Sequence, residues 1–178
     1  TLMNKVFEVI EAKKIFNINL KNIDIVINSN SYIHAIVIFK NGIIKLLAHE
    51  PKMEIPLFNT FNNIKNTNFF ENNNLNLNKI NHLNLRTPNK TQFKSLKILN
   101  IIPNNDSLFE TVLITANDEL VDMFLRKKIK YEKLIFYLTK IIKFKIFKKY
   151  YKVKPNSIRQ ILKVRKLTKE VVNKYVSV

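Results

Sequence analysis

Apolar residues follow a helical period near both ends of the chain. In MNKVFEVIEAKKIF they recur about every three to four positions, which predicts an amphipathic helix over the first sixteen residues. After Pro155, the segment SIRQILKVRKLTKEVVNKYV has a similar pattern and predicts a final helix. The apolar stripe of the first helix consists of Met3, Val6, Phe7, Ile10 and Ile15. A further helix is predicted by four apolar residues on one face: Leu134, Leu138, Ile141 and Ile142.

Three runs rich in β-branched residues follow the first helix and predict strands. They are IDIVI, YIHAIVIF and IIKLLA. Lys40-Asn41-Gly42 joins the second run to the third, and Asn-Gly is the strongest short signal for a β-hairpin because both residues tolerate a positive φ. The beginning of the chain is therefore predicted to be a helix followed by a sheet.

Three regions are predicted along the chain. Residues 1–58 form an α/β portion with a small sheet, and residues 85–178 form a mainly α-helical C-terminal bundle. Residues 59–84 contain 12 asparagines without a clear period, which predicts an irregular connector. In the helical region, Thr115-Ala116-Asn117-Asp118 precedes an apolar run and resembles the start of a helix. The predicted fold class is α/β (α+β) followed by helices.

The formal net charge of +18 suggests a nucleic-acid partner. However, lysine outnumbers arginine 27 to 4 and glycine occurs once, whereas asparagine, isoleucine, phenylalanine and tyrosine are abundant. The abundant amino acids are those of A/T-rich codons, and recognition of nucleic acid favours arginine for its bidentate geometry. We therefore attribute most of the charge to nucleotide composition. A basic nucleic-acid-binding module stays open as an alternative.

The composition also excludes several kinds of chemistry. The sequence has no cysteine, which rules out disulfides, thiolate metal sites and a cysteine nucleophile. Its longest purely apolar stretch, residues 35–39, is too short to cross a bilayer, and no signal-peptide pattern precedes the first helix. The single glycine, Gly42, cannot form a glycine-rich dinucleotide fingerprint. We expect a soluble chain without a membrane partner.

Polar side chains at the start of the first helix are the main candidates for chemistry. Asn4 and Glu8 are four residues apart and so share a face, with Lys5 beside them. An amide, an ammonium and a carboxylate at a helix N-terminus could hold a phosphate next to Mg²⁺ or Mn²⁺. The alternative is an exposed Lys–Glu pair without a function, and the spacing alone favours this alternative.

Three further segments allow more than one interpretation. His34 lies inside a predicted strand, where a hydrogen-bonded core or interface role is more common than catalysis. The segment AHEPKMEIP, which contains Met53, is either a mobile loop over a site or a solvated connection. The segment KIIKFKIFKKYYKVK, residues 140–154, suggests a membrane-surface helix, a nucleic-acid patch or a product of the biased composition.

Several of these segments, in this order, resemble the C-terminal half of the 1-deoxy-D-xylulose 5-phosphate reductoisomerase family. TLMNKVFEVIEAKKIF is similar to the family's Met-Asn-Lys motif followed by Glu-x-Ile-Glu-Ala and an aromatic residue. PKMEIPLF is similar to the family's Pro-Asp-Met-Arg-x-Pro-Ile segment. The resemblance covers nearly the whole chain apart from the asparagine-rich connector. The matching segments are TLMNKVFEVIEAKKIF, IDIVINSNSYIHAIVIFKNG, PKMEIPLF, LNLRTPNKTQFKSLKI and TVLITANDELVDMFLRKKIKY.

The resemblance implies a function and a site. In this family Mg²⁺ or Mn²⁺ chelates the substrate's oxygens, the carbon skeleton rearranges, and NADPH reduces the resulting aldehyde to 2-C-methyl-D-erythritol 4-phosphate, a step of non-mevalonate isoprenoid biosynthesis. Asn4 and Lys5 match positions that hold the substrate phosphate. Glu8 matches a catalytic carboxylate that binds the metal and lies against the substrate. His34 and Met53 match positions with supporting roles, and a homodimer is implied by the resemblance alone.

Other parts of the family's machinery have no counterpart in this sequence. The family's Asp-x-Glu metal ligands and NADPH domain precede the matched region, so we expect Thr1 to be a truncation point and the fragment alone to be inactive. Motif residues also differ at Asn28-Ser29, Ala35, Lys52 and Glu54, and a non-catalytic remnant or dimerisation scaffold is therefore an alternative. The A/T-biased composition suits a bacterial endosymbiont, where the protein would be cytoplasmic, or a plastid-bearing parasite, where it would lie in the plastid.

Overall fold

The chain is divided into two compact units in the computed structural model, which describes residues 2–61 and 77–176. The helical unit comprises Thr1–Asp24 and Asn89–Val178, and the sheet unit comprises Ile25–Pro88. The first helix therefore belongs to the same unit as the C-terminal helices. The domain boundaries expected near residues 58 and 84 stay a prediction.

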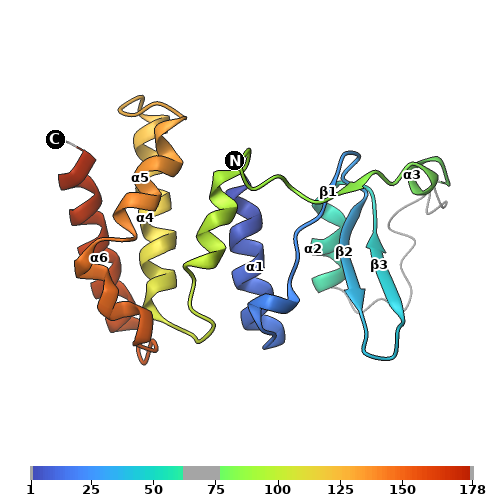
Figure 1. Ribbon diagram of the computed structural model, residues 1–178, viewed down its shortest axis with the longest axis horizontal. Coiled ribbons are helices and arrows are strands. Elements are labelled where there is room, and N and C mark those ends of the chain that lie inside the picture. The colour runs from blue at the N-terminus through green and yellow to red at the C-terminus, as the bar shows by residue number, and fades with distance from the viewer. Residues whose placement is uncertain (1, 62–76, 177–178) are drawn as a thin grey trace. The chain divides into compact units, whose positions relative to one another are not determined.

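The helical unit is built around a long central helix, α4, that packs against α5, η3 and α6 (Figure 1). The first helix, α1, packs against the 3₁₀-helix η2. α1 is followed by its C-cap residue Asn17, whose φ of 50° is the left-handed conformation that commonly terminates helices. The elements of this unit are α1 (Met3–Phe16), η1 (Leu20–Asn22), η2 (Lys94–Asn100), α4 (Leu108–Leu125), α5 (Lys133–Ile141), η3 (Lys145–Lys152) and α6 (Ile158–Val176).

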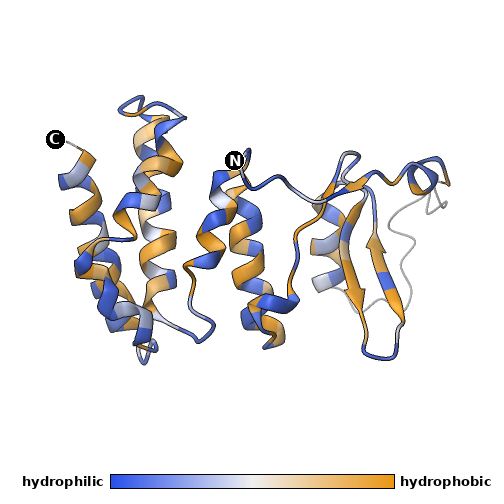
Figure 2. Ribbon diagram, viewed as in Figure 1, coloured by the Kyte–Doolittle hydropathy of each residue, from blue (hydrophilic) through white to orange (hydrophobic). Residues whose placement is uncertain are grey.

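Helix periodicity explains which side chains form the core of the helical unit. Figure 2 shows that apolar and polar residues alternate around the helices, so that one face can pack while another meets water. The predicted helices at the two ends of the chain are confirmed. Ile15 belongs to the predicted apolar stripe on α1 but does not join the core, because it lies in the last turn of the helix and is exposed. The stripe on and just after α5 is buried as predicted: Leu134, Leu138, Ile141 and Ile142.

The helix start expected at Thr115–Asp118 is wrong. These residues lie inside α4, which begins seven residues earlier at Leu108. Thr115 and Ala116 lie three and four positions after the fully buried Val112, so the helical period places them on the same packed face. The polar residues of this run therefore do not mark a helix terminus.

The basic segment of residues 140–154 uses its apolar side chains inside the protein. Most of it is the 3₁₀-helix η3, and Phe147 is fully buried together with Ile141 and Ile142. Side chains enclosed in this way cannot also insert into a membrane surface, so the interpretation as a membrane-surface helix is wrong for them.

The sheet unit contains the predicted hairpin and a second, shorter strand pair. In the antiparallel hairpin, Ile38 is paired with Ile44 and Ile36 with Leu46. Gly42 has a φ of 86° in the turn, which a glycine adopts without steric cost. The elements are β1 (Ile27–Asn28), β2 (Ile33–Ile38), β3 (Ile44–Ala48), α2 (Glu54–Phe61), α3 (Leu77–Asn81) and β4 (Leu85–Arg86), with β1 paired antiparallel to β4.

The predicted fold class, a small sheet with a mainly helical C-terminal part, is confirmed. Within the asparagine-rich connector, residues 62–76 lie outside the described residues; residues 59–61 belong to α2 and residues 77–81 to α3, whereas residues 82–84 are irregular as expected. The region expected to be helical begins with β4. None of the described helices combines the length and apolar composition needed to span a lipid bilayer.

Candidate functional site at the start of α1

The first two turns of α1 separate a packed face from a polar face. Met3 and Val6 are buried, whereas Asn4 and Glu8 are exposed and Lys5 is partly exposed. The helical period thus brings Asn4, Lys5 and Glu8 to accessible positions on the same two turns. The Lys5 Nζ atom lies 2.6 Å from Glu8 Oε2, with the two side chains 43% and 53% exposed. The Lys–Glu pair expected from the spacing is therefore present.

The N-terminus of α1 adds backbone donors to this polar face. Among the described residues no side chain caps the helix at Leu2, and the first turn contains no acidic residue. The first N–H groups of a helix have no partner within the helix, and the helix dipole is positive at this end. Together with the Lys5 ammonium, these groups make the start of α1 favourable for an anion such as phosphate.

Glu8 is a suitable oxygen ligand for a hard divalent cation, but it provides one carboxylate only. Within residues 2–61 and 77–176, no group of three or more His, Asp or Glu side chains gathers in the way a metal site requires. The described residues are thus compatible with part of a metal site and do not form a complete one.

The sheet unit holds the other two residues predicted from the sequence. His34 is exposed on β2, and its ring stacks on His49 with centroids 3.6 Å apart and planes 6° apart. The His34 Nε2 atom also lies 3.2 Å from the His49 carbonyl oxygen, so hydrogen bonding and stacking fix this imidazole in place. Met53 precedes α2 directly, and its side chain is 71% exposed.

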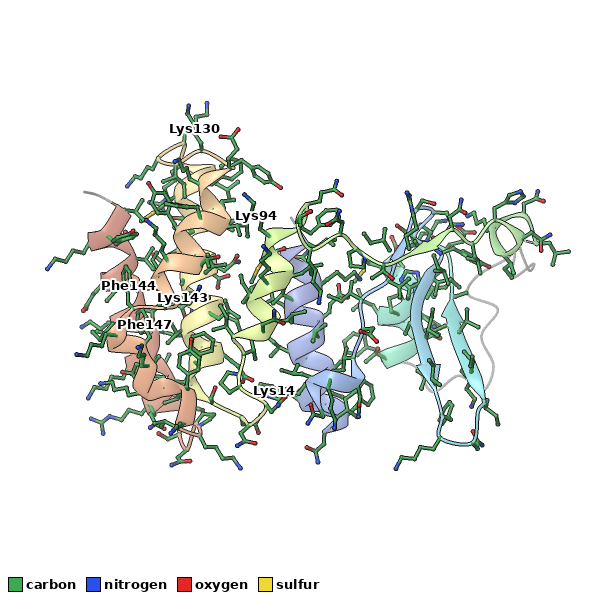
Figure 3. The ribbon with its side chains drawn as sticks, in the orientation of Figure 1. Lys14, Lys94, Lys130, Lys143, Phe144 and Phe147 are labelled. Carbon is green, nitrogen blue, oxygen red and sulfur yellow. The ribbon has the colours of Figure 1, made fainter. Side chains whose placement is uncertain are left out.

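A buried ion pair in the helical unit was missed by the sequence reasoning. Lys13 on α1 and Glu110 on α4 are 6% and 4% exposed, and Lys13 Nζ lies 3.1 Å from Glu110 Oε1. Lys13 also donates a hydrogen bond of 3.0 Å to the carbonyl of Pro103. Lys14, labelled in Figure 3, binds the second oxygen of Glu110 and lies 3.1 Å from Asp106 Oδ1. These contacts join α1 to the start of α4.

This network shifts the pKa of two of its members. Partial burial lowers the pKa of Lys14, but hydrogen bonds to Glu110 and Asp106 outweigh this effect, so the net pKa is raised. The hydrogen bond from Lys14 lowers the pKa of Asp106, and the positive charge of Lys14 adds to the effect. Both shifts favour the charged forms and so support the ion pairs.

Two sequence signals could have revealed the network. Lys13 follows Val6 and Ile10 by seven and three positions, so it falls on the packed stripe of α1. Ser107-x-x-Glu110 has the spacing of a capping box, a better indicator for the start of α4 than Thr115. In the structure Glu110 binds the two lysines, and Ser107 makes no capping hydrogen bond.

Comparison with known proteins relates the whole chain to one group of enzymes. A model of the DXP reductoisomerase C-terminal domain family matches residues 49–171. The 1-deoxy-D-xylulose 5-phosphate reductoisomerase of Pelagibacter ubique is 47% identical over 163 residues, which cover 90% of this chain and 41% of that protein. The enzyme of the same name from Clostridium tetani is 31% identical over 173 residues, which cover 97% and 43%. The chain thus spans less than half the length of these relatives.

Solved structures share the fold. A DOX-P reductoisomerase in complex with NADPH, fosmidomycin and magnesium matches with a TM-score of 0.87 at 22% identity, over 99% of this chain and 44% of that chain. The enzyme from Zymomonas mobilis in complex with NADPH matches with a TM-score of 0.81 at 22% identity, over 99% of this chain and 45% of that one.

The structural matches show that this chain has the same arrangement of helices and small sheets as part of a reductoisomerase. The chain belongs to the DXP reductoisomerase C-terminal domain family. This confirms the family resemblance that the ordered sequence motifs carried.

Proposed function

We propose that this chain supplies the C-terminal portion of an NADPH- and divalent-metal-dependent reductoisomerase. The reaction is the conversion of 1-deoxy-D-xylulose 5-phosphate into 2-C-methyl-D-erythritol 4-phosphate. The observation that supports the proposal is the accessible polar face at the start of α1, where Asn4, Lys5 and Glu8 lie on turns whose apolar residues are buried. A rigidly packed helix that presents an amide, an ammonium and a carboxylate suits a phosphorylated substrate next to a metal.

Asn4 and Lys5 have the role of binding the substrate phosphate in this proposal. Lys5 is paired with Glu8 in the structure, and a phosphate would compete for its ammonium group. If the Lys5 ammonium binds the phosphate instead of Glu8, the Glu8 carboxylate becomes available to a cation. Binding of the phosphate and binding of the metal are thus expected to support each other.

Glu8 has the role of a metal ligand that also contacts the substrate. A bound Mg²⁺ or Mn²⁺ supplies Lewis-acid polarisation of the substrate's oxygens. Because Glu8 offers a single carboxylate, the remaining ligands are proposed to come from the substrate, from water and from residues outside this chain.

NADPH is proposed to bind to a portion of the enzyme outside these residues, because a sequence with one glycine has no dinucleotide fingerprint. His34 and Met53 are assigned supporting roles, and the stacked His49 would keep the His34 ring oriented. We further propose that the enzyme is a homodimer and works in the cytoplasm of a bacterium.

The test uses the whole protein that carries this chain, assayed by NADPH oxidation with 1-deoxy-D-xylulose 5-phosphate and Mn²⁺. Glu8→Gln is expected to lower kcat by roughly a hundredfold or more and to raise the Mn²⁺ concentration for half-maximal rate, because Lewis-acid stabilisation contributes several kcal/mol. Lys5→Gln is expected to lower kcat/KM by about 10- to 100-fold, since a hydrogen bond to a charged group is worth about 1.5–3 kcal/mol.

Matched controls lie on the exposed side of α6, where Lys166→Gln and Glu170→Gln make the same changes in charge. These controls are expected to keep wild-type kinetics and an unchanged Mn²⁺ dependence. If the folded wild-type protein shows no turnover with metal and NADPH, the chain is instead a remnant or scaffold. Equal losses in the α1 variants and in the controls would contradict the assigned roles.

A further inference from the structure

A hollow lined by lysines lies on the helical unit and includes none of Asn4, Lys5 and Glu8. Its volume is about 510 Å³, within the range of cavities that hold small ligands. It is formed by η2 and the residue after it, together with α5 and its flanks, and α5 packs against η2. Figure 3 labels Lys94 on η2 and Lys143 just after α5. The lining residues are Lys94, Lys97, Ile101, Glu132, Ile135, Phe136, Thr139, Lys140 and Lys143.

The wall of this hollow includes apolar surface that remains accessible. Ile101, Ile135 and Phe136 contribute to it, and Phe136 is 47% exposed. The Lys140 ammonium lies 4.4 Å from the centroid of the Phe136 ring, and the Lys133 ammonium lies 5.3 Å from it. Positive charge is thus held directly against an apolar surface.

The charge of the hollow is strongly unbalanced. Four lysines and Glu132 give a net charge of +3, that is, four positive charges and one negative charge. None of Lys94, Lys97 and Lys143 forms an ion pair with a described acidic residue, in contrast to Lys13 and Lys14 of the same unit. A neighbouring hollow, also of about 510 Å³, shares Lys143 and adds Lys148. Like charges gathered around a low-dielectric surface attract anions.

We propose that this hollow binds a small amphiphilic anion, namely a phosphate or diphosphate monoester with an apolar chain. The anionic head interacts with Lys94, Lys97 and Lys143, and the chain lies along Ile135 and Phe136. Because two ammonium groups already contact the Phe136 ring, an aliphatic chain fits this surface better than a stacked base. The site does not depend on the proposed reductoisomerase function.

The test is isothermal titration calorimetry of the whole chain with three probes, each below its micelle-forming concentration. Octyl phosphate carries both the head and the chain, inorganic phosphate carries the head only, and octyl glucoside carries the chain without a charge. One molecule of octyl phosphate is expected to bind per chain, at least about tenfold more tightly than either other probe, since head and chain each contribute.

Two variants divide the binding into its parts. Phe136→Ala is expected to weaken octyl phosphate by roughly three- to tenfold and inorganic phosphate by clearly less, because the lysines over this ring are Lys133 and Lys140 and not the three that bind the head. The combined variant K94Q/K97Q/K140Q/K143Q is expected to weaken octyl phosphate by at least about tenfold. A matched variant with the same loss of four charges, K128Q/K163Q/K166Q/K174Q, replaces exposed lysines outside the hollow and is expected to change binding by less than about threefold.

Three results would overturn the proposal. They are a lack of saturable binding of octyl phosphate, equal weakening by the two four-lysine variants, and displacement of octyl phosphate by a much lower concentration of a single-stranded oligonucleotide. The last result would instead identify the lysines as part of a nucleic-acid surface. Circular dichroism of each variant verifies that it is folded, and Phe136→Ala tests the hollow even if a four-lysine variant fails to fold.

Discussion

The helical unit and the sheet unit differ in how they bury apolar side chains. Of the buried apolar residues in the described chain, only Tyr32 and Pro88 come from the sheet unit, and all others belong to the helical unit. Every residue of β3 is exposed, including Leu47 at 59%. The helical unit therefore has a core of its own, whereas the hairpin presents apolar side chains to water.

Ion pairs show the same contrast. Lys13 and Glu110 of the helical unit are almost completely buried, and each loses its hydration in the folded state. In the sheet unit, Lys79 and Glu50 lie 2.6 Å apart but are 34% and 44% exposed. Burial makes a polar contact costly to break, whereas a half-exposed pair can exchange its partner for water. We expect the helical unit to be sensitive to point changes and the sheet unit to be tolerant.

The largest effect is expected when one partner of the buried pair is removed. Glu110→Leu leaves the Lys13 ammonium buried with carbonyl partners only, and should lower the free energy of unfolding by about 3–5 kcal/mol. Glu50→Leu in the sheet unit should cost at most about 1 kcal/mol. Denaturant unfolding followed by circular dichroism measures both changes. A cost below 1 kcal/mol for Glu110→Leu would mean that the pair is not buried in solution.

A matched leucine truncation tests the difference in packing. Leu113 on α4 is fully buried, and Leu113→Ala should lower the free energy of unfolding by about 2–5 kcal/mol. Leu47→Ala on β3 removes the same atoms from an exposed position and should change it by less than about 0.5 kcal/mol. Comparable losses for both variants in urea unfolding would show that the apolar face of the hairpin is covered.

Local patterns were sufficient to predict much of this fold. The period of apolar residues identified α1 and α6, and Asn41-Gly42 identified the hairpin turn, because these signals lie within a few residues of each other. The pairing of β1 with β4 could not be predicted in this way. It joins two-residue strands that are distant in the sequence, and such short strands have no period of their own.

For the candidate site, the sequence placed Asn4, Lys5 and Glu8 on one accessible helix face, as the structure has them. Their functional roles stay a prediction from the family resemblance. The sequence reasoning missed the partnership of Lys13 and Glu110, because two charged residues about a hundred positions apart are expected at the surface unless their burial is known. Helical spacing indicates which face a residue occupies, and it does not identify the partner across the core.

A smaller effect is expected at the hairpin turn. Gly42 has a φ of 86°, and apart from Gly42 itself and its two chain neighbours no heavy atom lies within 4 Å of the position that a Cβ would occupy. Gly42→Ala therefore strains the backbone without a clash and should destabilise the hairpin by about 1–2 kcal/mol. Amide hydrogen exchange should accelerate in β2 and β3 and stay unchanged in α4, with Lys40→Ala as the exposed control. Acceleration in α4 would show that the hairpin and the helical core unfold together.

The smallest expected effect concerns the pH dependence of the helical unit. The hydrogen bond from Lys14 lowers the pKa of Asp106 below its usual 3.8, so this carboxylate stabilises the folded state above pH 3.8. The stabilisation is lost as the pH falls through the lowered pKa. Because Lys14 and Asp106 are 39% and 46% exposed, we expect Asp106→Asn to remove less than about 1 kcal/mol at neutral pH and to flatten the acid limb of the stability curve.

Thermal unfolding of wild type and Asp106→Asn between about pH 2 and pH 6 measures this change, with the exposed Asp118→Asn on α4 as the control. The difference between wild type and Asp106→Asn should vanish at the lowest pH, where the carboxylate is protonated in both the folded and the unfolded state. It should also shrink in high salt, because the pair is accessible to screening ions. If the stability difference between wild type and Asp106→Asn persists unchanged at low pH, Asp106 stabilises the fold by packing, because protonation of its carboxylate would then have no effect. In that case Glu110 would be the acidic residue whose ion pairs with Lys13 and Lys14 connect α1 to α4.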